Sequence, residues 1–207
     1  MVLSVLMAAI VSYLLGNHNG AICVSAILGD DVRNHGSGNA GLTNFIRNYG
    51  TSSALLVILI DAGKAVLACV LGGLLLQPYG MALEGRVLGG VCVMLGHVYP
   101  ALQGFRGGKG ILSGLFVALS VDWRIALMIV IVFFTFYLLT NYVSLGSILS
   151  SLAFGIGFVV FYHSNIPVML GGLFMSALAV FMHRSNLVRL LKGQERKTNL
   201  FSKGKKA

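Results

Sequence analysis

The hydrophobic pattern of the chain is a series of long apolar runs separated by short polar segments. An apolar helix needs about 20 residues to cross a bilayer, and most of the runs approach or exceed that length. The pattern therefore predicts an all-α, polytopic membrane protein with about seven transmembrane helices. The expected spans cover about 2–28, 52–76, 86–103, 110–121, 125–140, 143–162 and 166–182.

Three details of this span pattern affect its interpretation. The first run lacks a basic start and a clear small-x-small cleavage site, so we interpret it as a retained span and not as a signal peptide. The fourth run is too short to cross unaided as a straight helix, which implies a tilted, broken or partly re-entrant segment. After it, Asp122-Trp123-Arg124 combines two charges with an interfacial Trp and predicts a turn.

Composition agrees with the membrane class. The chain is 57% hydrophobic and only 10% charged, with a mean hydropathy of +0.87, whereas soluble domains carry far more charge. Loops are short and no repeat or linker is evident, so we expect one integral-membrane domain over residues 1–207. Three cysteines stand apart within apolar runs and are interpreted as small apolar residues. These are Cys23, Cys69 and Cys92.

Positive charge is concentrated in a few segments, and this predicts the orientation. The formal net charge is +9, and residues 184–207 hold eight Lys or Arg against one acid, Glu195. If this basic tail is cytoplasmic, the N-terminus lies outside and the segments 29–51, 104–109 and 141–142 lie inside. Those segments hold four Lys or Arg and the tail holds eight, so twelve of the fifteen Lys and Arg residues lie on the inside. This agrees with the positive-inside rule. Contact with anionic lipid is favoured over nucleic acid as the partner of the tail.

The first polar segment is NHGSGNAGLTNFIR, residues 34–47. It contains G-x-G-x-x-G from Gly36 to Gly41, but without the preceding strand and βαβ unit that dinucleotide binding requires. Glycines still allow backbone N–H groups to approach an anion, and a helix start can bind phosphate. The alternative is an ordinary polar loop with glycine turns. Arg47 could add a charged fork, and further hydrogen bonds could come from Ser37, Asn39, Thr43 and Asn44.

The second polar segment is GHVYPALQGFRGGKG, residues 96–110. Its glycine-rich end lacks the spacing of a P-loop, because Gly110 and not Ser or Thr follows Lys109. A mobile Lys among backbone donors is nevertheless a suitable phosphate partner. The alternative is a topology signal or a snorkelling charge. His97 could belong to a site, but a satisfied interfacial histidine is the favoured interpretation.

The third polar segment is HRSNLVRLLKGQERK, residues 183–197. His183 and Asn186 are three residues apart and would share one face of a helix, with Arg189 three residues further along. The functional and structural interpretations of this His are balanced. Within the second span, Asp61 and Lys64 are also spaced i, i+3; buried charge in a bilayer is costly and usually paired, so a structural pair is favoured over a catalytic role.

Together the three segments resemble the bacterial membrane glycerol-3-phosphate acyltransferases of the PlsY type, which use acyl phosphate as the donor. The matching stretches are GSGNAGLTNFIR, GHVYPALQGFRGGKG and HRSNLVRLLKGQE, in the order and spacing of the family over nearly the whole chain. LIDAGKA around Asp61 also resembles a family element. Leu42 replaces the usual Ala, LLGNHNGA stands in place of a G-S-x-P element, and GQE replaces the commoner G-T-E.

The resemblance implies a multi-pass enzyme of the bacterial cell membrane with its site facing the cytoplasm. It would transfer a fatty acyl group from acyl phosphate to the 1-hydroxyl of sn-glycerol 3-phosphate, giving lysophosphatidic acid for phospholipid biosynthesis. The expected partners are these two substrates, the lipid bilayer and the soluble enzyme that produces acyl phosphate. No nucleic acid, metal or other cofactor is expected. The phosphate-binding residues implied by the resemblance are Ser37, Arg47, Lys109, His183 and Asn186. The chemistry of the first polar segment adds Asn39 to this set.

Ser37 and His183 are the expected catalytic residues. Acyl phosphate is a mixed anhydride with a good leaving group, so the enzyme mainly needs positioning and charge stabilisation. His183 could act as the general base, or the substrate's own phosphate could take the proton. An acyl-Ser37 intermediate is disfavoured, because no evident base lies beside Ser37 in the sequence.

Three other classes of function fit the sequence less well. A transporter for an anionic solute would also use glycine-broken spans and nearby cations, but the polar segments lie on one predicted side without a mirrored set. A lipid phosphotransferase of the CDP-alcohol type needs repeated aspartates at a metal, and the six acids of this chain form no such cluster. A scaffold without catalysis would leave the three polar segments unexplained.

Overall fold

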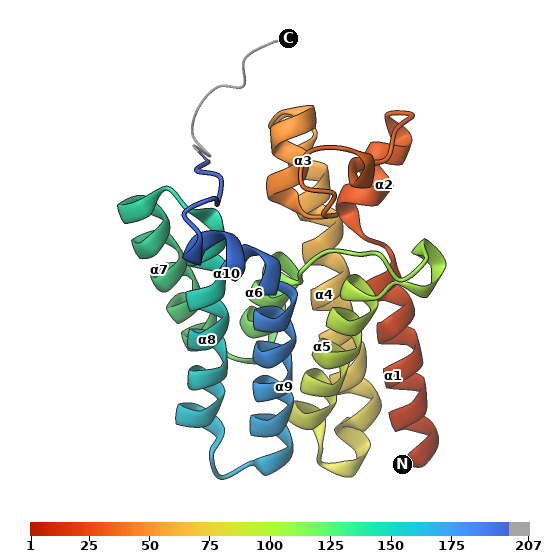
Figure 1. Ribbon diagram of the computed structural model, residues 1–207. Helices are drawn as coiled ribbons and strands as arrows, with labels where there is room; N and C mark the ends of the chain where they lie inside the picture. Colours follow the sequence, from red (N-terminus) through yellow and green to blue (C-terminus); the bar gives the residue numbers. More distant parts are fainter. Residues whose placement is uncertain (199–207) are drawn as a thin grey trace. The chain divides into compact units, whose positions relative to one another are not determined.

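The computed structural model describes residues 1–198, which form helices and connecting loops without a strand (Figure 1). This confirms the all-α prediction for the described residues. Contacts divide the chain into two compact units, Met1–Val121 and the part that begins at Asp122, and each is described by itself. Three lysines of the predicted basic tail, Lys203, Lys205 and Lys206, lie outside the described residues.

The first unit is built around α4, which packs against α5, α1, α6 and α2. The two short helices α2 and α3 lie near the end of α4 that is remote from the N-terminus of the chain (Figure 1). The α-helices are α1 (Val2–Asn17), α2 (Gly20–Ile27), α3 (Leu42–Tyr49), α4 (Ala54–Leu76), α5 (Ala82–Val98) and α6 (Ile111–Val121). The 3-10 helices are η1 (Val32–Asn34), η2 (Gln77–Tyr79) and η3 (Ala101–Gln103).

Glycines permit close packing of the long helices in the first unit. A Cβ atom at Gly72 of α4 would collide with the backbone of Gly85 in α5, and one at Gly89 would collide with the backbone of Ala68. A Cβ at Gly96 would likewise meet the backbone of α1. Small residues at such contacts let membrane helices approach each other closely.

The first apolar run is broken, with α1 and α2 meeting at a bend of 42°. The sequence predicted one span over about 2–28; the structure breaks its helix at His18 and Asn19, and the bent pair is still apolar enough to form one span. Asn19 begins α2 by accepting a hydrogen bond of 3.1 Å from the N–H of Ile22, the usual arrangement at a helix N-cap. The polar stretch GNHNG within the apolar run is the sequence signal for this break.

The described part of the second unit, up to residue 198, contains four helices connected by short turns. Asp122 caps the first of them by accepting a hydrogen bond of 2.9 Å from the N–H of Arg124. The turn predicted at 122–124 is therefore confirmed. The last two helices meet at a bend of 52°. The helices are α7 (Trp123–Thr140), α8 (Val143–Tyr162), α9 (Ile166–Met182) and α10 (Arg184–Leu191).

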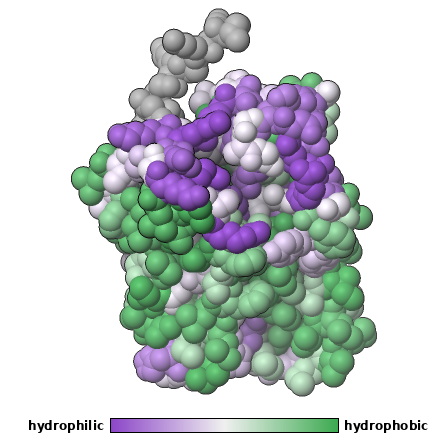
Figure 2. All heavy atoms as spheres, viewed as in Figure 1, coloured by the Kyte–Doolittle hydropathy of each residue, from purple (hydrophilic) through white to green (hydrophobic). Residues whose placement is uncertain are grey.

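Within residues 1–198, four helical segments are long and apolar enough to cross a membrane, those that contain α4, α5, α7 and α8. The bent pairs α1–α2 and α9–α10 raise the number to six if each pair is one span, and α6 is apolar but shorter. Figure 2 shows apolar residues along the long helices of the first unit and hydrophilic residues gathered at the end that carries α2 and α3. The seventh span and the outside position of the N-terminus stay predictions.

Candidate active site

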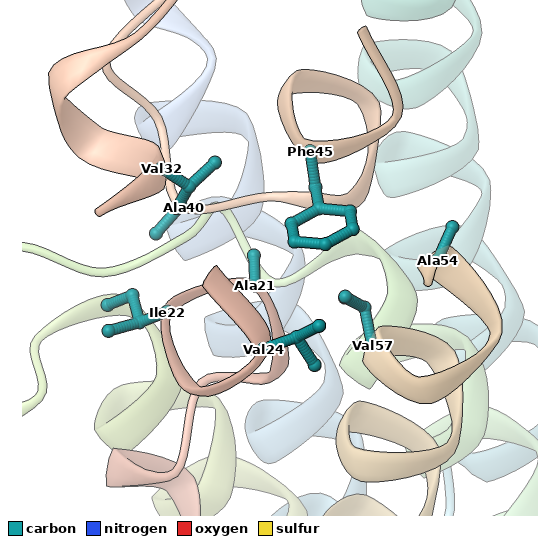
Figure 3. Packing of buried hydrophobic residues seen from close by; sticks show 8 residues of the cluster. All are labelled: Ala21, Ile22, Val24, Val32, Ala40, Phe45, Ala54 and Val57. Carbon is teal, nitrogen blue, oxygen red and sulfur yellow. The ribbon is translucent and has the colours of Figure 1, made fainter. Parts of the chain in front are cut away.

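The polar loop of residues 33–39 has both of its ends fixed in an apolar cluster. Val32 and Ala40 flank the loop and are fully buried. They pack in the same cluster as Phe45 of α3, Ala21 of α2 and Val57 of α4 (Figure 3). Burial of these side chains holds the ends of the loop, while the loop between them remains polar and largely exposed.

The side-chain amide of Asn44 holds the loop together from α3. This residue is only 2% exposed. Its Nδ2 donates to the carbonyl oxygens of Val32 (3.1 Å), His35 (3.0 Å) and Asn39 (3.1 Å), and its Oδ1 accepts from the N–H of Ser37 (3.0 Å). Sequence analysis offered Asn44 as a ligand for phosphate, but the structure uses the amide to shape the loop.

Ser37 lies at an exposed turn between Gly36 and Gly38, whose φ angles are +60° and +69°. This left-handed region strongly favours glycine. The backbone N–H of Gly38 donates to the carbonyl of His35 at 3.0 Å, and that of Ser37 is bonded to Asn44. Two of the backbone donors that could approach an anion, those of Ser37 and Gly38, are thus engaged within the loop.

Three side chains of this first segment were predicted to bind phosphate. Ser37 and Arg47 are exposed, and Asn39 is half-buried. Arg47 is three residues after Asn44 on α3, so both lie on the same side of that helix. One short helix therefore carries both Asn44, whose amide holds the loop, and Arg47.

The second segment crosses the last turn of α5. The N–H of Gly107 donates to the carbonyl of Val98 at 3.2 Å, and the N–H of Gly108 donates to the carbonyl of His97 at 3.1 Å. These bonds satisfy carbonyl groups that the end of a helix leaves open. Lys109 follows directly, with a half-buried side chain. Two backbone donors of this segment are thus also engaged internally.

The first and second segments meet within the first unit. Gly108 lies against the carbonyl oxygen of Ala40, which would be 2.7 Å from a Cβ atom on this glycine. Arg33 donates through Nη1 to the carbonyl of Gln103 at 2.8 Å and pairs with Asp31 at 2.8 Å. Its guanidinium holds the pKa of Asp31 below the usual value. Sequence analysis used Arg33 only for topology and missed this link between the segments.

Asp61 and Lys64 of α4 form a buried ion pair, with Nζ and Oδ1 2.7 Å apart. The Lys64 ammonium also lies 2.9 Å from Nδ1 of His97 and 3.0 Å from the carbonyl of His18. Asp61 accepts from the N–H of Gly20 at 3.1 Å. The pair thus supplies hydrogen bonds to the backbone at the break between α1 and α2, where helical bonds are missing. These contacts favour the structural interpretation of the pair.

The third segment lies in the second unit, at the junction of α9 and α10. His183 is buried, and its Nδ1 lies 2.8 Å from the carbonyl oxygen of Ala179. A carbonyl can only accept, so we assign the proton of the neutral ring to Nδ1, which makes Nε2 an acceptor. This tautomer suits a group that receives a proton at Nε2.

Glu195 holds the rest of the third segment. It accepts from Nδ2 of Asn186 at 2.9 Å and from Nε of Arg189 at 2.7 Å. Burial raises the pKa of Glu195, but these hydrogen bonds outweigh it and keep the pKa below the usual value. One amide N–H of Asn186 is therefore used within the segment. Glu195 was counted only as the single acid of the basic tail.

The predicted site residues are divided between the two units. Ser37, Asn39, Arg47 and Lys109 belong to the first unit, and His183 and Asn186 belong to the second. Within residues 1–198, no group of three or more His, Cys, Asp or Glu side chains could hold a metal ion. The described site chemistry thus consists of hydroxyl, amide, imidazole and cationic groups.

The family of the chain follows from its match to a family model. The model described as "Glycerol-3-phosphate acyltransferase" matches residues 6–193. The chain belongs to this family. A glycerol-3-phosphate acyltransferase of Thermoanaerobacter sp. (strain X514) is 38% identical over 192 residues, which cover 92% of this chain and 94% of the relative. One of Clostridioides difficile (strain 630) is 38% identical over 202 residues, with 95% and 96% covered.

The acyltransferase also shares its fold with solved structures of PlsY (YgiH), an integral membrane glycerol 3-phosphate acyltransferase. The glycerol 3-phosphate form has a TM-score of 0.84 and 31% identity, covering 96% of this chain and all of that chain. The lysophosphatidic acid form has a TM-score of 0.81 and 33% identity, covering 95% and 96%. This acyltransferase is therefore a membrane enzyme of the PlsY type, as the three motifs predicted, and the family places it in phospholipid biosynthesis.

Proposed function

We propose that this acyltransferase takes its acyl group from an acyl phosphate and transfers it to the 1-hydroxyl of glycerol 3-phosphate. The products are lysophosphatidic acid and inorganic phosphate. The observation that carries the proposal is the junction of the Ser37 loop with the segment of Gly108 and Lys109, where hydroxyl and cationic side chains come from two joined segments. The related PlsY has a glycerol 3-phosphate form and a lysophosphatidic acid form, which supports this acceptor and this product.

Both proposed substrates carry a phosphate, and the residues of the site suit this group. Arg47 offers a planar fork for two phosphate oxygens, and Lys109 offers a mobile point charge. Ser37 and Asn39 add uncharged hydrogen bonds from the loop. From the family resemblance of the third segment, His183 and Asn186 are proposed as two further phosphate-binding residues.

The transfer needs few covalent steps. The 1-hydroxyl oxygen attacks the acyl carbonyl carbon, and the new C–O ester bond forms as the bond from that carbon to the phosphate oxygen breaks. The electron pair of the broken bond leaves with inorganic phosphate, whose charge Arg47 and Lys109 stabilise. In the proposal, the hydroxyl proton passes either to Nε2 of His183 or to the phosphate of the substrate.

Ser37 acts in this proposal as a hydrogen-bonding group and not as a nucleophile that carries the acyl group. A nucleophilic Ser is normally activated by a base within hydrogen-bonding distance. Within residues 1–198, the hydrogen bond found for Ser37 runs from its backbone N–H to Asn44 and involves no base. The uncharged role therefore agrees better with the local geometry.

We further propose that the polar segments face the cytoplasm of the bacterial cell membrane, with the N-terminus outside. The support is the positive charge of segments 29–51 and 104–109, since such charge marks cytoplasmic loops. Acyl phosphate from a soluble enzyme would then reach the site from the same side. Labelling of a single cysteine introduced at Arg106, from either side of sealed vesicles, tests the orientation.

A donor comparison tests the central proposal. The full-length enzyme in detergent receives labelled glycerol 3-phosphate with either palmitoyl phosphate or palmitoyl-CoA, and product formation is followed by chromatography. We expect lysophosphatidic acid from palmitoyl phosphate alone, with the ester at the 1-position by NMR. Product from palmitoyl-CoA alone would reject the proposed donor while leaving the family assignment intact.

Substitution of Arg47 tests the phosphate site. Hydrogen bonds to charged groups contribute roughly 1.5–3 kcal/mol, so Arg47→Ala should raise the KM of a phosphate substrate by about 10- to 100-fold. Arg47→Lys should lie between this variant and the parent because it keeps the charge without the fork, and Ser37→Ala should also lower activity. Arg86→Ala removes a different exposed arginine of the first unit and should have parental kinetics. A fully active Arg47→Ala enzyme would refute the site as proposed.

A further inference from the structure

The Asp61–Lys64–His97 cluster has no part in the proposed chemistry, although it is costly to bury. The three residues are 2%, 6% and 4% exposed, respectively. Ionisable residues inside membrane helices are rare and usually paired, and a buried ion pair often gains little net stability over apolar packing. The pair satisfies the backbone at the helix break, but this does not explain why a histidine adjoins it.

Lys64 determines which nitrogen of His97 carries a proton. An ammonium group only donates hydrogen bonds. Since Nζ of Lys64 lies 2.9 Å from Nδ1 of His97, Nδ1 is the acceptor and the proton of the neutral ring is on Nε2. Lys64 is itself held by the Asp61 carboxylate and the His18 carbonyl. The cluster therefore fixes both the tautomer and the orientation of the imidazole.

The Nε2 edge of His97 faces the segment that carries Lys109. A Cβ atom at Gly108 would collide with Nε2, and it would also lie 2.7 Å from the carbonyl oxygen of Ala40. The backbone of His97 accepts from the N–H of Gly108 at 3.1 Å, so ring and backbone both adjoin this glycine. Nε2 is thereby placed where the first and second polar segments meet.

The Nε2–H group has no acceptor among residues 1–198, because both side-chain hydrogen bonds found for His97 involve Nδ1. A donor in such a buried residue is normally satisfied, because leaving it without a partner destabilises the fold. Nε2 is also not enclosed: the fully enclosed side-chain atoms without a partner in the described chain are the hydroxyls of Ser12 and Ser144. A donor that is unpartnered but reachable suits an oxygen atom of a ligand.

We propose that His97 is a further substrate-binding residue, whose Nε2–H donates a hydrogen bond to a phosphate oxygen held at the Gly108–Lys109 segment. Lys64 acts as a positioning residue, since it reaches the substrate only through His97. The inference rests on the proposed function of the site. The phosphate belongs to glycerol 3-phosphate or to acyl phosphate, and the two share the chemistry that the donor recognises.

Two substitutions separate donation to substrate from a purely structural role. His97→Asn places an amide oxygen near the position of Nδ1, so it retains the acceptor for Lys64 but lacks the donor at Nε2. His97→Gln places an amide N–H₂ group near Nε2 and retains the donor. We expect the Asn variant to keep the parental melting temperature and to raise the KM of one phosphate substrate about tenfold, with kcat much less affected. The Gln variant should lie closer to the parent in KM.

The assay uses the full-length enzyme in detergent, with glycerol 3-phosphate and palmitoyl phosphate each varied in turn, and the substrate whose KM rises identifies the phosphate. Calorimetric binding of glycerol 3-phosphate adds a readout that does not need the donor. Ser113→Ala is the matched control, because Oγ of Ser113 lies 3.5 Å from Nδ1 on the other edge of the ring, and it should leave both KM values unchanged.

A folded His97→Asn enzyme with parental KM values for both substrates would overturn the inference and show that water satisfies Nε2. If the Asn variant fails to fold, a His97→Gln enzyme with a tenfold higher KM would overturn it equally, since that variant keeps the donor. Failure of the proposed donor is a separate outcome, because it would appear in the parent enzyme as absence of product from palmitoyl phosphate.

Discussion

The loop of residues 33–39 and the segment of residues 183–195 both carry predicted substrate-binding residues, but they are held in different ways. The loop is held by Asn44, a buried and uncharged amide that bonds four backbone groups. The segment is held by Glu195, a carboxylate that pairs with Arg189, whose side chain is 40% exposed. The first arrangement depends on neutral hydrogen bonds in a closed environment, and the second depends on charge close to water.

This difference predicts different responses to substitution and to solvent. Removing a buried amide removes uncharged hydrogen bonds, and this loss does not depend on pH or ionic strength. An ion pair with an exposed partner contributes less, and salt and acid weaken it. We therefore expect substitutions in the loop to cause the larger losses, and the segment to be the more sensitive to pH.

The largest effect is expected from Asn44→Ala. This change removes four hydrogen bonds: the N–H of Ser37 loses its partner, and the carbonyls of Val32, His35 and Asn39 keep only backbone N–H donors. At roughly 0.5–1.5 kcal/mol for each hydrogen bond, the free energy of unfolding should fall by about 3 kcal/mol. Because the loop also loses its shape, kcat/KM should fall by about 100-fold. Thermal unfolding in detergent and initial rates measure the two effects.

Asn48→Ala is the matched control for this experiment. Asn48 is one turn further along α3, and its exposed amide donates to the backbone carbonyl of Asn44 at 2.8 Å and to Oδ1 of Asn44 at 3.2 Å. Its loss should cost less than about 1 kcal/mol and leave the rate nearly unchanged. Equal losses in the two variants would mean that the Asn44 amide has no special role in holding the loop.

Glu195→Gln should have an intermediate effect that depends on pH. Hydrogen bonds from Asn186 and Arg189 lower the pKa of Glu195 in the folded state, so its stabilising contribution is present above the unfolded pKa of about 4.3. It is lost as the pH falls through the folded pKa. At pH 7 we expect the melting temperature of the variant to lie about 3 °C below the parent.

This gap between variant and parent should narrow as the pH falls from about 5 to about 3. Melting curves across that range measure the gap. The other carboxylates titrate in both proteins, so their contribution is removed when the two melting temperatures are subtracted. A gap of constant size would show that Glu195 does not act through its charge. The same gap should shrink in high salt, because one partner is exposed.

Tyr49→Phe should have the smallest effect of the three. Its hydroxyl donates to Asp30 at 2.8 Å near the surface of the first unit. Burial, with this hydrogen bond, raises the pKa of Tyr49 to about 12, so the contact persists below pH about 10 and is lost as the pH rises through about 12. Melting temperature and rate at pH 7 should stay nearly parental. Losses of melting temperature and rate as large as those of Asn44→Ala would show that the surface hydrogen bond of Tyr49, and not only the Asn44 amide, holds the loop.

Most helices could be predicted from the sequence because they depend on apolar runs. The spans predicted at 143–162 and 166–182 coincide with α8 and α9. The break between α1 and α2 was missed although the polar stretch GNHNG marks it, because the groups that satisfy its backbone, Asp61 and Lys64, come from a distant helix. The short helix α3 was also missed, since its few apolar residues lie in a stretch rich in Asn and Gly.

The residue types of the candidate site could also be predicted, but not the role of each one. Ser37 and Arg47 are exposed, whereas Asn44 from the same segment faces the backbone of its own loop. Glu195 performs a similar supporting role for Asn186. Spacing along the chain cannot separate these roles, because an amide or carboxylate uses the same atoms for a loop and for a ligand.

Asn19 and Gly20 form an Asn-Gly pair, a chemically labile dipeptide in which the backbone nitrogen of the glycine can attack the side-chain amide. In the folded chain the N–H of Gly20 is bonded to Asp61, and the amide of Asn19 donates to the carbonyl of Ala40 at 3.0 Å. Deamidation would replace this donor with a carboxylate in a fully buried position. The hydrogen bonds at the bend between α1 and α2 thus protect Asn19 from deamidation. Storage under partly denaturing conditions would remove them and damage the enzyme irreversibly at this dipeptide.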